Sequence, residues 1–193
     1  MKSIVTKSRQ TGLAIILVGL MVMIIGLGQY FESKLKVATL IQNNIGSFKK
    51  YEVLEGLVTY SLPEGWIASE GSTSKENVKY FNEFISEDAN IRGFIQVIQE
   101  KEDLKKLINS DIEEVKGMGI KDYTLEQRLV KGHNAKIIKY NIGSSENNIS
   151  KGYNYYISNE GCIVKINFLL KDKTHKENTQ VFLENIVNTI SFK

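Results

Sequence analysis

The sequence has 193 residues, 42% of them hydrophobic and 24% charged, with 25 basic and 22 acidic side chains. Lys2, Lys7 and Arg9 precede the first acidic residue, Glu32, so the net charge of +3 comes from this tail and the chain beyond residue 31 is formally neutral. A neutral domain lacks the basic footprint by which proteins bind nucleic acid, and the single cysteine excludes an internal disulfide, so the domain must be stable through packing alone.

The first predicted element is a membrane-spanning helix over residues 12–31. The stretch carries no charge, and about twenty helical residues reach roughly 30 Å, the thickness of the hydrocarbon core of a bilayer. The basic residues before it predict that residues 1–11 form a cytoplasmic tail and that the C-terminal part is extracytoplasmic. We therefore expect a single-pass cell membrane protein, anchored in the lipid bilayer by this helix.

A cleaved signal peptide is the alternative to this signal-anchor. Cleavage requires a shorter apolar core followed by a small-x-small site, and Gly26-Leu-Gly28 is the one weak candidate. Its position after so long an apolar run favours a retained anchor. A lipoprotein is disfavoured as well, because the only cysteine, Cys162, lies far from the apolar run.

Residues 32–50 are loosely apolar at helical spacing, which predicts a juxtamembrane helix or a linker. The extracytoplasmic domain is expected over residues 51–193, a length that suits one domain. Its first strand is predicted over Leu57–Leu62, and Pro63-Glu-Gly65-Trp66 predicts a turn after which Trp66 returns the chain to the core.

Two further strands are predicted over Val78–Ser86 and Ile91–Glu100, joined by a turn at residues 87–90. Apolar residues lie on both faces of the second strand, with Ile95 and Val97 on one face and Phe94 and Ile98 on the other. A sheet with two apolar faces must be covered on both, so we expect helices on each side.

An amphipathic helix is predicted over Asp103–Lys116, with Asp103 as its N-cap and glycines at its end. Four strands follow, over residues 123–130, 135–142, 152–158 and 162–171, with turn residues between them that favour antiparallel neighbours. In the last strand, alternation predicts that even-numbered residues from Cys162 to Leu170 face inward and that Lys165, Asn167 and Lys171 face outward.

A final helix is predicted over residues 176–190, opened by the capping-box sequence Thr174-His-Lys-Glu177. Its buried stripe is expected to comprise Phe182, Leu183, Ile186, Val187 and Ile190. The order of elements indicates an α+β fold in which a single antiparallel β-sheet is flanked by helices.

The sequence resembles the PsbP-like superfamily in several short motifs. These are Tyr60-Ser-Leu-Pro-Glu-Gly-Trp66, the central amphipathic helix, Gly161-Cys162 at the start of a long strand, and Ile190-Ser191-Phe192 after the terminal helix. The resemblance spans about residues 51–193 and implies an α/β/α sandwich. It also implies action through partners, because most members are non-catalytic binding or assembly factors, but it assigns no catalytic, metal or cofactor residue.

No residue pattern points to catalysis or to a metal. His133 and His175 are the only histidines, and neither has other ligands at recognisable spacing. Cys162 is expected on the buried side of a strand, where a thiol is a small apolar residue rather than a nucleophile. We therefore expect no enzyme activity and no cofactor.

Tyrosines on neighbouring strands give one candidate binding surface, comprising Tyr140, Tyr153 and Tyr156 together with Trp66. The alternative is that Tyr153 and Tyr155 belong to the core and Tyr156 is a lone ring at the surface. The sequence predicts a membrane-anchored, extracytoplasmic, non-enzymatic binding or assembly module of the bacterial cell envelope with a protein partner. Two alternatives stay open: a carrier or sensor with a pocket for a small apolar ligand, lined by residues such as Trp66 and Phe94, and an uncharacterised hydrolase.

Overall fold

The computed structural model describes residues 17–18, 20–23, 25, 46–73, 75–99, 103–117, 120–142, 150–171 and 179–193. The chain divides into two compact units, Met1–Asn43 and Asn44–Lys193. The few described residues of the first unit are helical, and no helix formed by described residues is long and apolar enough to cross a membrane. The predicted tail, most of the predicted span and residues 32–45 lie outside the described residues, so the anchor stays a prediction.

Among the described residues, the second unit contains all the strands and the helices α2 and α3. In order these are β1 (Phe48–Val53), β2 (Val58–Pro63), β3 (Ile67–Glu70), β4 (Val78–Ile85), β5 (Ile91–Gln99), α2 (Leu104–Gly117), β6 (Ile120–Val130), β7 (His133–Ile142), β8 (Ser150–Asn159), β9 (Cys162–Leu170), α3 (Thr179–Val187) and β10 (Ser191–Phe192).

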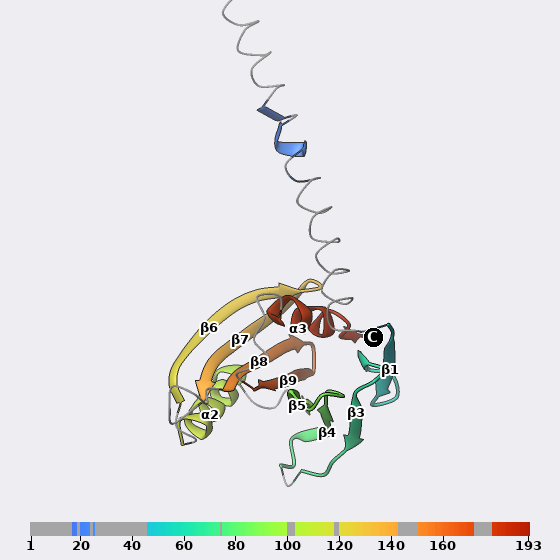
Figure 1. Cartoon of the computed structure of the whole chain (residues 1–193), viewed down its shortest axis with the longest axis vertical. Helices are drawn as coiled ribbons and strands as arrows, with labels where there is room; N and C mark the ends of the chain where they lie inside the picture. Colours follow the sequence, from blue (N-terminus) through green and yellow to red (C-terminus); the bar gives the residue numbers. More distant parts are fainter. Residues whose placement is uncertain are drawn as a thin grey trace, which may run out of the picture. The chain divides into compact units, whose positions relative to one another are not determined.

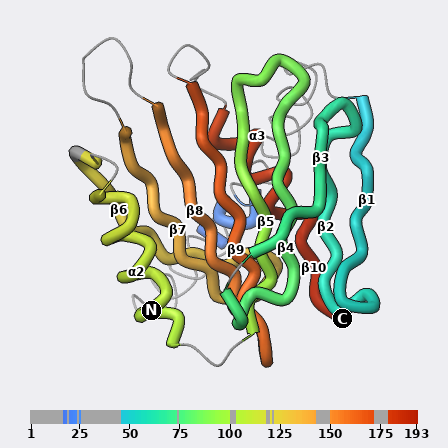
Figure 2. Tube along the Cα trace, turned by 90° about the horizontal axis from the view of Figure 1, so that it is seen from below, coloured from blue at the N-terminus to red at the C-terminus, as the bar shows by residue number. Residues whose placement is uncertain are grey.

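The strands form two antiparallel sheets, and the expectation of a single sheet is wrong. A large sheet has the strand order β3-β4-β5-β9-β8-β7-β6, and a small one has the order β1-β2-β10 (Figures 1 and 2). β1, β3 and β10 are not among the strands that the sequence predicts. β1 pairs along the whole of one edge of β2, and β10 pairs with Val58 and Thr59 on its other edge, so β2 belongs to the small sheet.

β1 also corrects the predicted juxtamembrane segment. Residues 48–50 were expected to belong to a helix or linker, but they form the first half of β1 and pair with residues 61–63 of β2. The remaining strands agree with the predicted ones to within a few residues. The β6–β7 connection is a two-residue turn in which Lys131 and Gly132 both have positive φ, as a type I′ hairpin requires.

The large sheet has a helix packed on each face, as the apolar pattern of β5 predicted (Figure 1). One face carries Ile98 of β5 and Ile163 of β9, which pack with α2 in one buried cluster; we call it the α2 face. The opposite face carries Ile95 and Ile166, both fully buried. We call it the α3 face, because α3 and the small sheet pack on it.

α2 begins where the sequence predicted. The Asp103 carboxylate accepts a hydrogen bond from the backbone N–H of Lys105 at 2.9 Å, so Asp103 is the N-cap. Leu107, Ile108 and Ile112 are buried against the sheet. The helix ends at Gly117, in agreement with the predicted stop.

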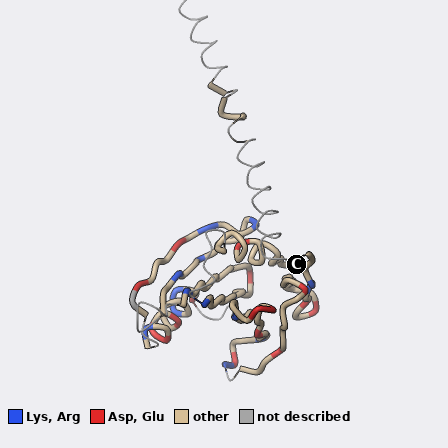
Figure 3. The backbone as a smooth tube through the Cα atoms, viewed as in Figure 1, with Lys and Arg blue, Asp and Glu red and all other residues tan. Residues whose placement is uncertain are grey.

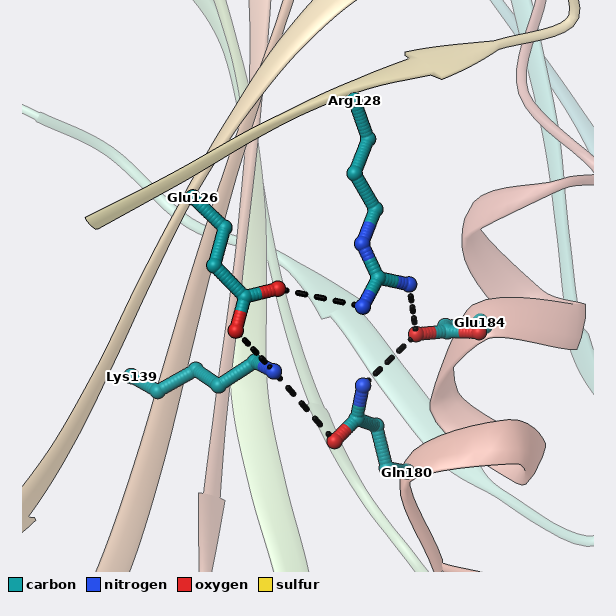
Figure 4. A network of polar contacts seen from close by, with 5 residues as sticks. All are labelled: Glu126, Arg128, Lys139, Gln180 and Glu184. Atoms are coloured by element: carbon teal, nitrogen blue, oxygen red, sulfur yellow. Dashed lines mark hydrogen bonds and ion pairs between the residues drawn. The ribbon is translucent and has the colours of Figure 1, made fainter. Parts of the chain in front are cut away.

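α3 begins at Thr179, and the proposed capping box at residues 174–177 lies outside the described residues. A polar network on the α3 face joins the helix to β6 and β7 (Figure 4). Arg128 contacts Glu126 at 3.1 Å and Glu184 of α3 at 2.8 Å, while Lys139 contacts Glu126 at 2.5 Å. Hydrogen bonding to Lys139 lowers the pKa of Glu126, so this carboxylate stays charged at neutral pH.

The small sheet is joined to the rest of the domain by hydrogen bonds between elements distant in sequence. Tyr60 of β2 contacts the Tyr80 hydroxyl at 2.9 Å and accepts a hydrogen bond from the Asn82 side-chain amide at 2.7 Å. The Ser61 backbone N–H donates to the Thr189 hydroxyl at 2.8 Å. Basic and acidic residues are interspersed along the described domain (Figure 3).

Gly93 marks a close approach in the middle of the large sheet. A Cβ atom at this position would lie 1.9 Å from the backbone oxygen of Asn167 and 2.8 Å from the ring of Phe84. The backbone of β9 cannot move away without breaking its ladder with β5. The position therefore requires glycine.

We predict that Gly93→Ala destabilises the domain by about 1–3 kcal/mol or more, as overpacking does in well-packed interiors. Gly117→Ala is the matched control, because a Cβ there meets nothing within 4 Å. Urea unfolding monitored by Trp66 fluorescence would measure both variants. Equal stability of the two variants would contradict the close approach.

Candidate functional site

α2 covers only part of the α2 face, and a groove of about 460 Å³ lies on the part that it leaves open. Ile67 of β3 is 70% exposed at its rim, and Phe94 of β5 is half-buried within it. We call it the sheet groove; its lining residues are Ile67, Ser69, Glu83, Phe84, Ile85, Arg92, Gly93, Phe94, Asn167 and Leu169.

The sheet groove combines apolar side chains with one charge of each sign. Ile67, Ile85 and Leu169 supply aliphatic surface, and Arg92 and Glu83 are exposed. Apolar surface with a few polar groups is the composition typical of binding sites. The groove can therefore bury an apolar group and orient a charged one.

Phe94 connects the sheet groove to buried charges. Its ring packs on that of Phe81, with centroids 5.6 Å apart, and the Lys165 ammonium lies 5.1 Å from its centroid. At this distance a cation is attracted to an aromatic face. The Phe94 ring, which forms part of the groove wall, thus packs against the Lys165 ammonium.

Lys165 forms a buried ion pair with Asp111 of α2. The Lys165 Nζ and Asp111 Oδ2 atoms are 2.7 Å apart, and the two residues are only 7% and 3% exposed. The expectation that Lys165 faces outward into solvent is therefore wrong. Its side chain does point away from Phe168 and its neighbours, but α2 covers that face and provides the carboxylate.

A chain of hydrogen bonds runs from this ion pair across the sheet. Tyr156 donates to Asp111 Oδ2 at 2.6 Å, and the Asn154 amide donates to the Tyr156 hydroxyl at 3.4 Å. Tyr140 donates to Asn154 at 3.4 Å, and the Asn167 amide donates to the Tyr140 hydroxyl at 3.1 Å. Asn167 lines the sheet groove, so the chain links the groove to α2.

Burial and charge keep the hydroxyl groups of this chain protonated. Burial raises the pKa of Tyr156, and the neighbouring Asp111 carboxylate raises it further. Burial likewise raises the pKa of Tyr140. Both tyrosines are therefore hydrogen-bond donors at any physiological pH.

A second groove, of about 380 Å³, opens beside the ion pair. Its polar lining includes Lys75, Gln96 and Lys106, and its apolar lining includes Val78 and Leu107. Asp111 and Lys165 also line it. The ion pair is therefore buried between two grooves.

The structure places the proposed tyrosine surface inside the domain. Tyr140, Tyr153 and Tyr156 are all buried, and the expectation that Tyr156 is a lone surface ring is wrong. Tyr140 and Tyr156 belong to the hydrogen-bonded chain on the α2 face. Tyr153 lies on the α3 face, so the sheet separates it from them.

Trp66 is half-buried and packs on the α3 side of the domain. Its ring stacks on Phe84 at 5.3 Å and meets Phe182 edge-on at 5.9 Å, which agrees with its predicted return to the core. Trp66 does not line the sheet groove, whereas Phe94 does. The predicted pairing of Trp66 with Phe94 in one pocket is therefore wrong.

Other candidates for chemistry contribute no cluster in the described residues. No group of three or more His, Cys, Asp or Glu side chains there could hold a metal ion. His133 packs on the ring of Phe192 at 4.8 Å, and Cys162 is buried. His175 lies outside the described residues.

Sequence reasoning missed the Asp111–Lys165 pair, although two signals pointed to it. Asp111 falls on the apolar stripe of α2, four residues after Leu107 and three after Ile108. Lys165 interrupts β9, the most apolar of the described strands. Because buried charges are usually paired, an acidic residue in an apolar stripe and a basic residue in an apolar strand are expected to be partners.

Tyr155 and Tyr156 offer a matched test, because they lie on opposite faces of β8. The Tyr155 hydroxyl is buried and has no hydrogen-bond partner among the described residues, whereas Tyr156 donates to Asp111. We predict that Tyr156→Phe destabilises the domain by about 1.5–3 kcal/mol, as loss of a hydrogen bond to a charged group does. Tyr155→Phe should leave the free energy of unfolding unchanged or raise it by up to about 1 kcal/mol, measured by urea unfolding.

The pH dependence of stability provides a second readout. Burial raises the pKa of both tyrosines, so above pH 10 they stay protonated in the folded state and ionise in the unfolded one. Stability should fall as the pH rises above 10, by about 1.4 kcal/mol per unit for each such tyrosine, and either variant should make this slope shallower.

Equal losses in both variants at pH 7 would contradict the assignment of Tyr156 to the network.

No model of a known protein family matches the chain, and no curated protein matches its sequence. Among solved structures, the chain is similar to cyanobacterial PsbP (CyanoP) from Synechocystis sp. PCC 6803, with a TM-score of 0.56 and 13% identity over 77% of this chain and 94% of that one.

A protein from Bacteroides thetaiotaomicron VPI-5482 matches with a TM-score of 0.50 and 12% identity, over 75% of this chain and 48% of that one. The chain therefore spans about half of that protein. LpqN of Mycobacterium tuberculosis, described as involved in cell envelope biogenesis, matches with a TM-score of 0.43 and 12% identity, over 75% of this chain and 91% of that one. From the likeness to CyanoP we conclude that the domain has the PsbP-like fold that its sequence motifs predicted.

Proposed function

We propose that this protein is a membrane-anchored, extracytoplasmic binding module of the bacterial cell envelope that acts without catalysis. Its partner is an envelope protein that inserts an apolar segment with a flanking charge into the sheet groove. The observation that carries the proposal is the open part of the α2 face, where apolar residues remain exposed in a hollow beside Arg92 and Glu83.

The anchor is supported by the amino-acid sequence. Residues 12–31 carry no charge, and Lys2, Lys7 and Arg9 precede them. A helix of this length and composition is retained in a bilayer, with its basic end in the cytoplasm. The domain would then face the outside of the membrane, where envelope proteins are available as partners.

Exposure of apolar side chains supports the binding role. Ile67 is 70% exposed in a short strand, while Ile85, Phe94 and Leu169 are half-buried around it. A contiguous apolar hollow with a polar rim is typical of an interaction site. The buried chain of hydrogen bonds beneath it would hold the groove in one shape.

A small apolar ligand is the second candidate occupant. The groove has a volume of about 460 Å³, and an aromatic ring, Phe94, forms part of its wall. Volumes of this size hold small molecules in other proteins. A carrier or sensor would use the same residues and would need no protein partner.

We predict that a photo-crosslinking amino acid at position 67 captures one envelope protein when the full-length chain is irradiated in its native membrane. The same substitution at Leu57 is the matched control, because Leu57 is 42% exposed but does not line the groove. Arg92→Glu should reduce capture at position 67 at least about tenfold, since it places two acidic residues at the rim. Crosslinked bands would be identified by mass spectrometry.

Two results would contradict the protein-binding proposal. The first is the same crosslinking pattern at positions 67 and 57, which would mean that capture does not depend on the groove. The second is an apolar compound recovered from the purified wild-type protein but absent from Phe94→Ala, without capture at position 67. That second result would favour the carrier.

We predict that protease added to intact cells, with any outer barrier removed, digests the domain and leaves a cytoplasmic marker protein intact. Reversing the tail charges with Lys2→Glu, Lys7→Glu and Arg9→Glu should increase the protected fraction, because the orientation signal lies in these residues. Immunoblotting of the domain measures both. A wild-type domain digested only after the membrane is permeabilised would contradict the proposed orientation.

A further inference from the structure

β6 is a long strand at one edge of the large sheet. It has 11 residues, whereas the opposite edge strand, β3, has four. No described strand pairs with the outer edge of β6. The outward-facing backbone N–H and C=O groups of a strand in this position are available to another strand.

The side chains of β6 leave apolar surface exposed at this edge. On the α2 face Tyr123, Leu125 and Leu129 are 44%, 51% and 69% exposed. Edge strands are usually blunted by proline, by charged side chains, above all lysine, or by a bulge. The two charged side chains of residues 123–130, Glu126 and Arg128, form an ion pair with each other on the α3 face. Residues 123–130 contain neither proline nor lysine, and the one register shift of the strand lies before them, between Ile120 and Tyr123.

From this edge we infer that two copies of the chain associate through β6, which pairs antiparallel with β6 of the partner subunit about a twofold axis at Gln127. The axis is perpendicular to the sheet, so each face continues into the same face of the partner. Residues 124–130 of one copy then lie opposite residues 130–124 of the other, in the regular part of the strand.

This register matches apolar residues with apolar residues. Leu125 lies opposite Leu129 of the partner subunit on the α2 face, and the relation occurs twice in the dimer. Gln127 lies opposite its own copy at the axis, where two side-chain amides can hydrogen bond to each other. Leu125 and Leu129, which are exposed in a single copy, are covered in the dimer.

The charges on the other face select the same register. Glu126 lies opposite Arg128 of the partner subunit, and Arg128 lies opposite the partner's Glu126. Within one copy the Arg128 guanidinium and the Glu126 carboxylate already form an ion pair, with 3.1 Å between nitrogen and oxygen (Figure 4). The dimer thus brings two carboxylates and two guanidinium groups into an alternating square, in which each charge is flanked by opposite ones.

Neighbouring registers bring like charges together. Moving the axis to Glu126 places two carboxylates opposite each other, and moving it to Arg128 places two guanidinium groups opposite each other. Like charges directly opposite destabilise a strand pair. An axis at Leu125 would bring residues 121 and 122, in the irregular part of the strand, into the pairing.

Disulfide crosslinking of the full-length chain in its native membrane tests the register. Cys162 is first replaced by alanine, so that the introduced cysteine is the only thiol. Gln127→Cys should then give a disulfide-linked dimer under mild oxidation, because residues directly opposite in an antiparallel pair have Cα atoms about 4.5–5.5 Å apart. Leu125→Cys alone should not, because its two copies would lie about 13 Å apart along the strands.

A mixture of Leu125→Cys and Leu129→Cys chains should crosslink again, since these positions lie opposite each other. Crosslinking of Leu125→Cys as efficient as that of Gln127→Cys would overturn the register. Capture of a different polypeptide by Gln127→Cys, or no crosslinked dimer, would overturn the association of two copies.

Sedimentation of the full-length protein in detergent provides an independent measurement. Leu129→Lys should raise the dissociation constant of the dimer at least about tenfold, because it removes both leucine contacts and adds two charges to the seam. Leu57→Lys, also at an exposed apolar position, is the matched control and should leave the dimer unchanged. A monomer at all concentrations in the wild type, or equal weakening by both variants, would overturn the proposal.

Discussion

The buried ion pair between Asp111 and Lys165 is the constraint on which the arrangement of the α2 face depends. Removing two charges from water is costly, and only close pairing with further hydrogen bonds offsets the cost. Here the Asp111 carboxylate contacts both Lys165 and Tyr156, and the ammonium also lies near two aromatic rings. A helix shifted by one turn would leave both charges buried and unpaired, so the pair selects one position for α2.

The position of α2 in turn decides which part of the sheet stays open. With Asp111 above β9, the helix covers the end of the sheet at Ile98 and Ile163, and it leaves Phe94 and Leu169 uncovered. The hydrogen-bonded chain from Tyr156 to Asn167 extends from the covered part to the open part. Helix placement and groove shape are therefore linked through one buried network rather than set separately.

Local patterns in the sequence were enough to predict the elements that carry strong periodicity. β5 has apolar residues at both even and odd positions, and the structure buries residues on both of its faces. α2 has the predicted N-cap, apolar stripe and glycine stop. The same period-two rule failed at Lys165. It correctly separated the two faces of β9, but it could not tell that α2 covers the second face with a matching charge.

The two-sheet arrangement was missed for a related reason. β1 is mostly polar outside its last residue, and β10 has two residues, so neither shows a clear alternation. Both are strands because they pair with β2, one from the preceding segment and one from the end of the chain. Pairing between distant segments depends on the assembled core, and local propensity does not contain it.

The sheet groove and the exposed leucines of β6 lie on the same face of the large sheet and near opposite edges of it. The sheet groove lies on β3, β4, β5 and β9, whereas the exposed leucines lie on β6. A twofold axis perpendicular to the sheet at β6 keeps each face on its own side, so a dimer would present two sheet grooves on one continuous surface. Two sites on one rigid scaffold bind a repeated or dimeric partner more tightly than either site alone, because the second contact becomes intramolecular. Dimerisation through β6 would thus strengthen binding at the groove without changing any groove residue.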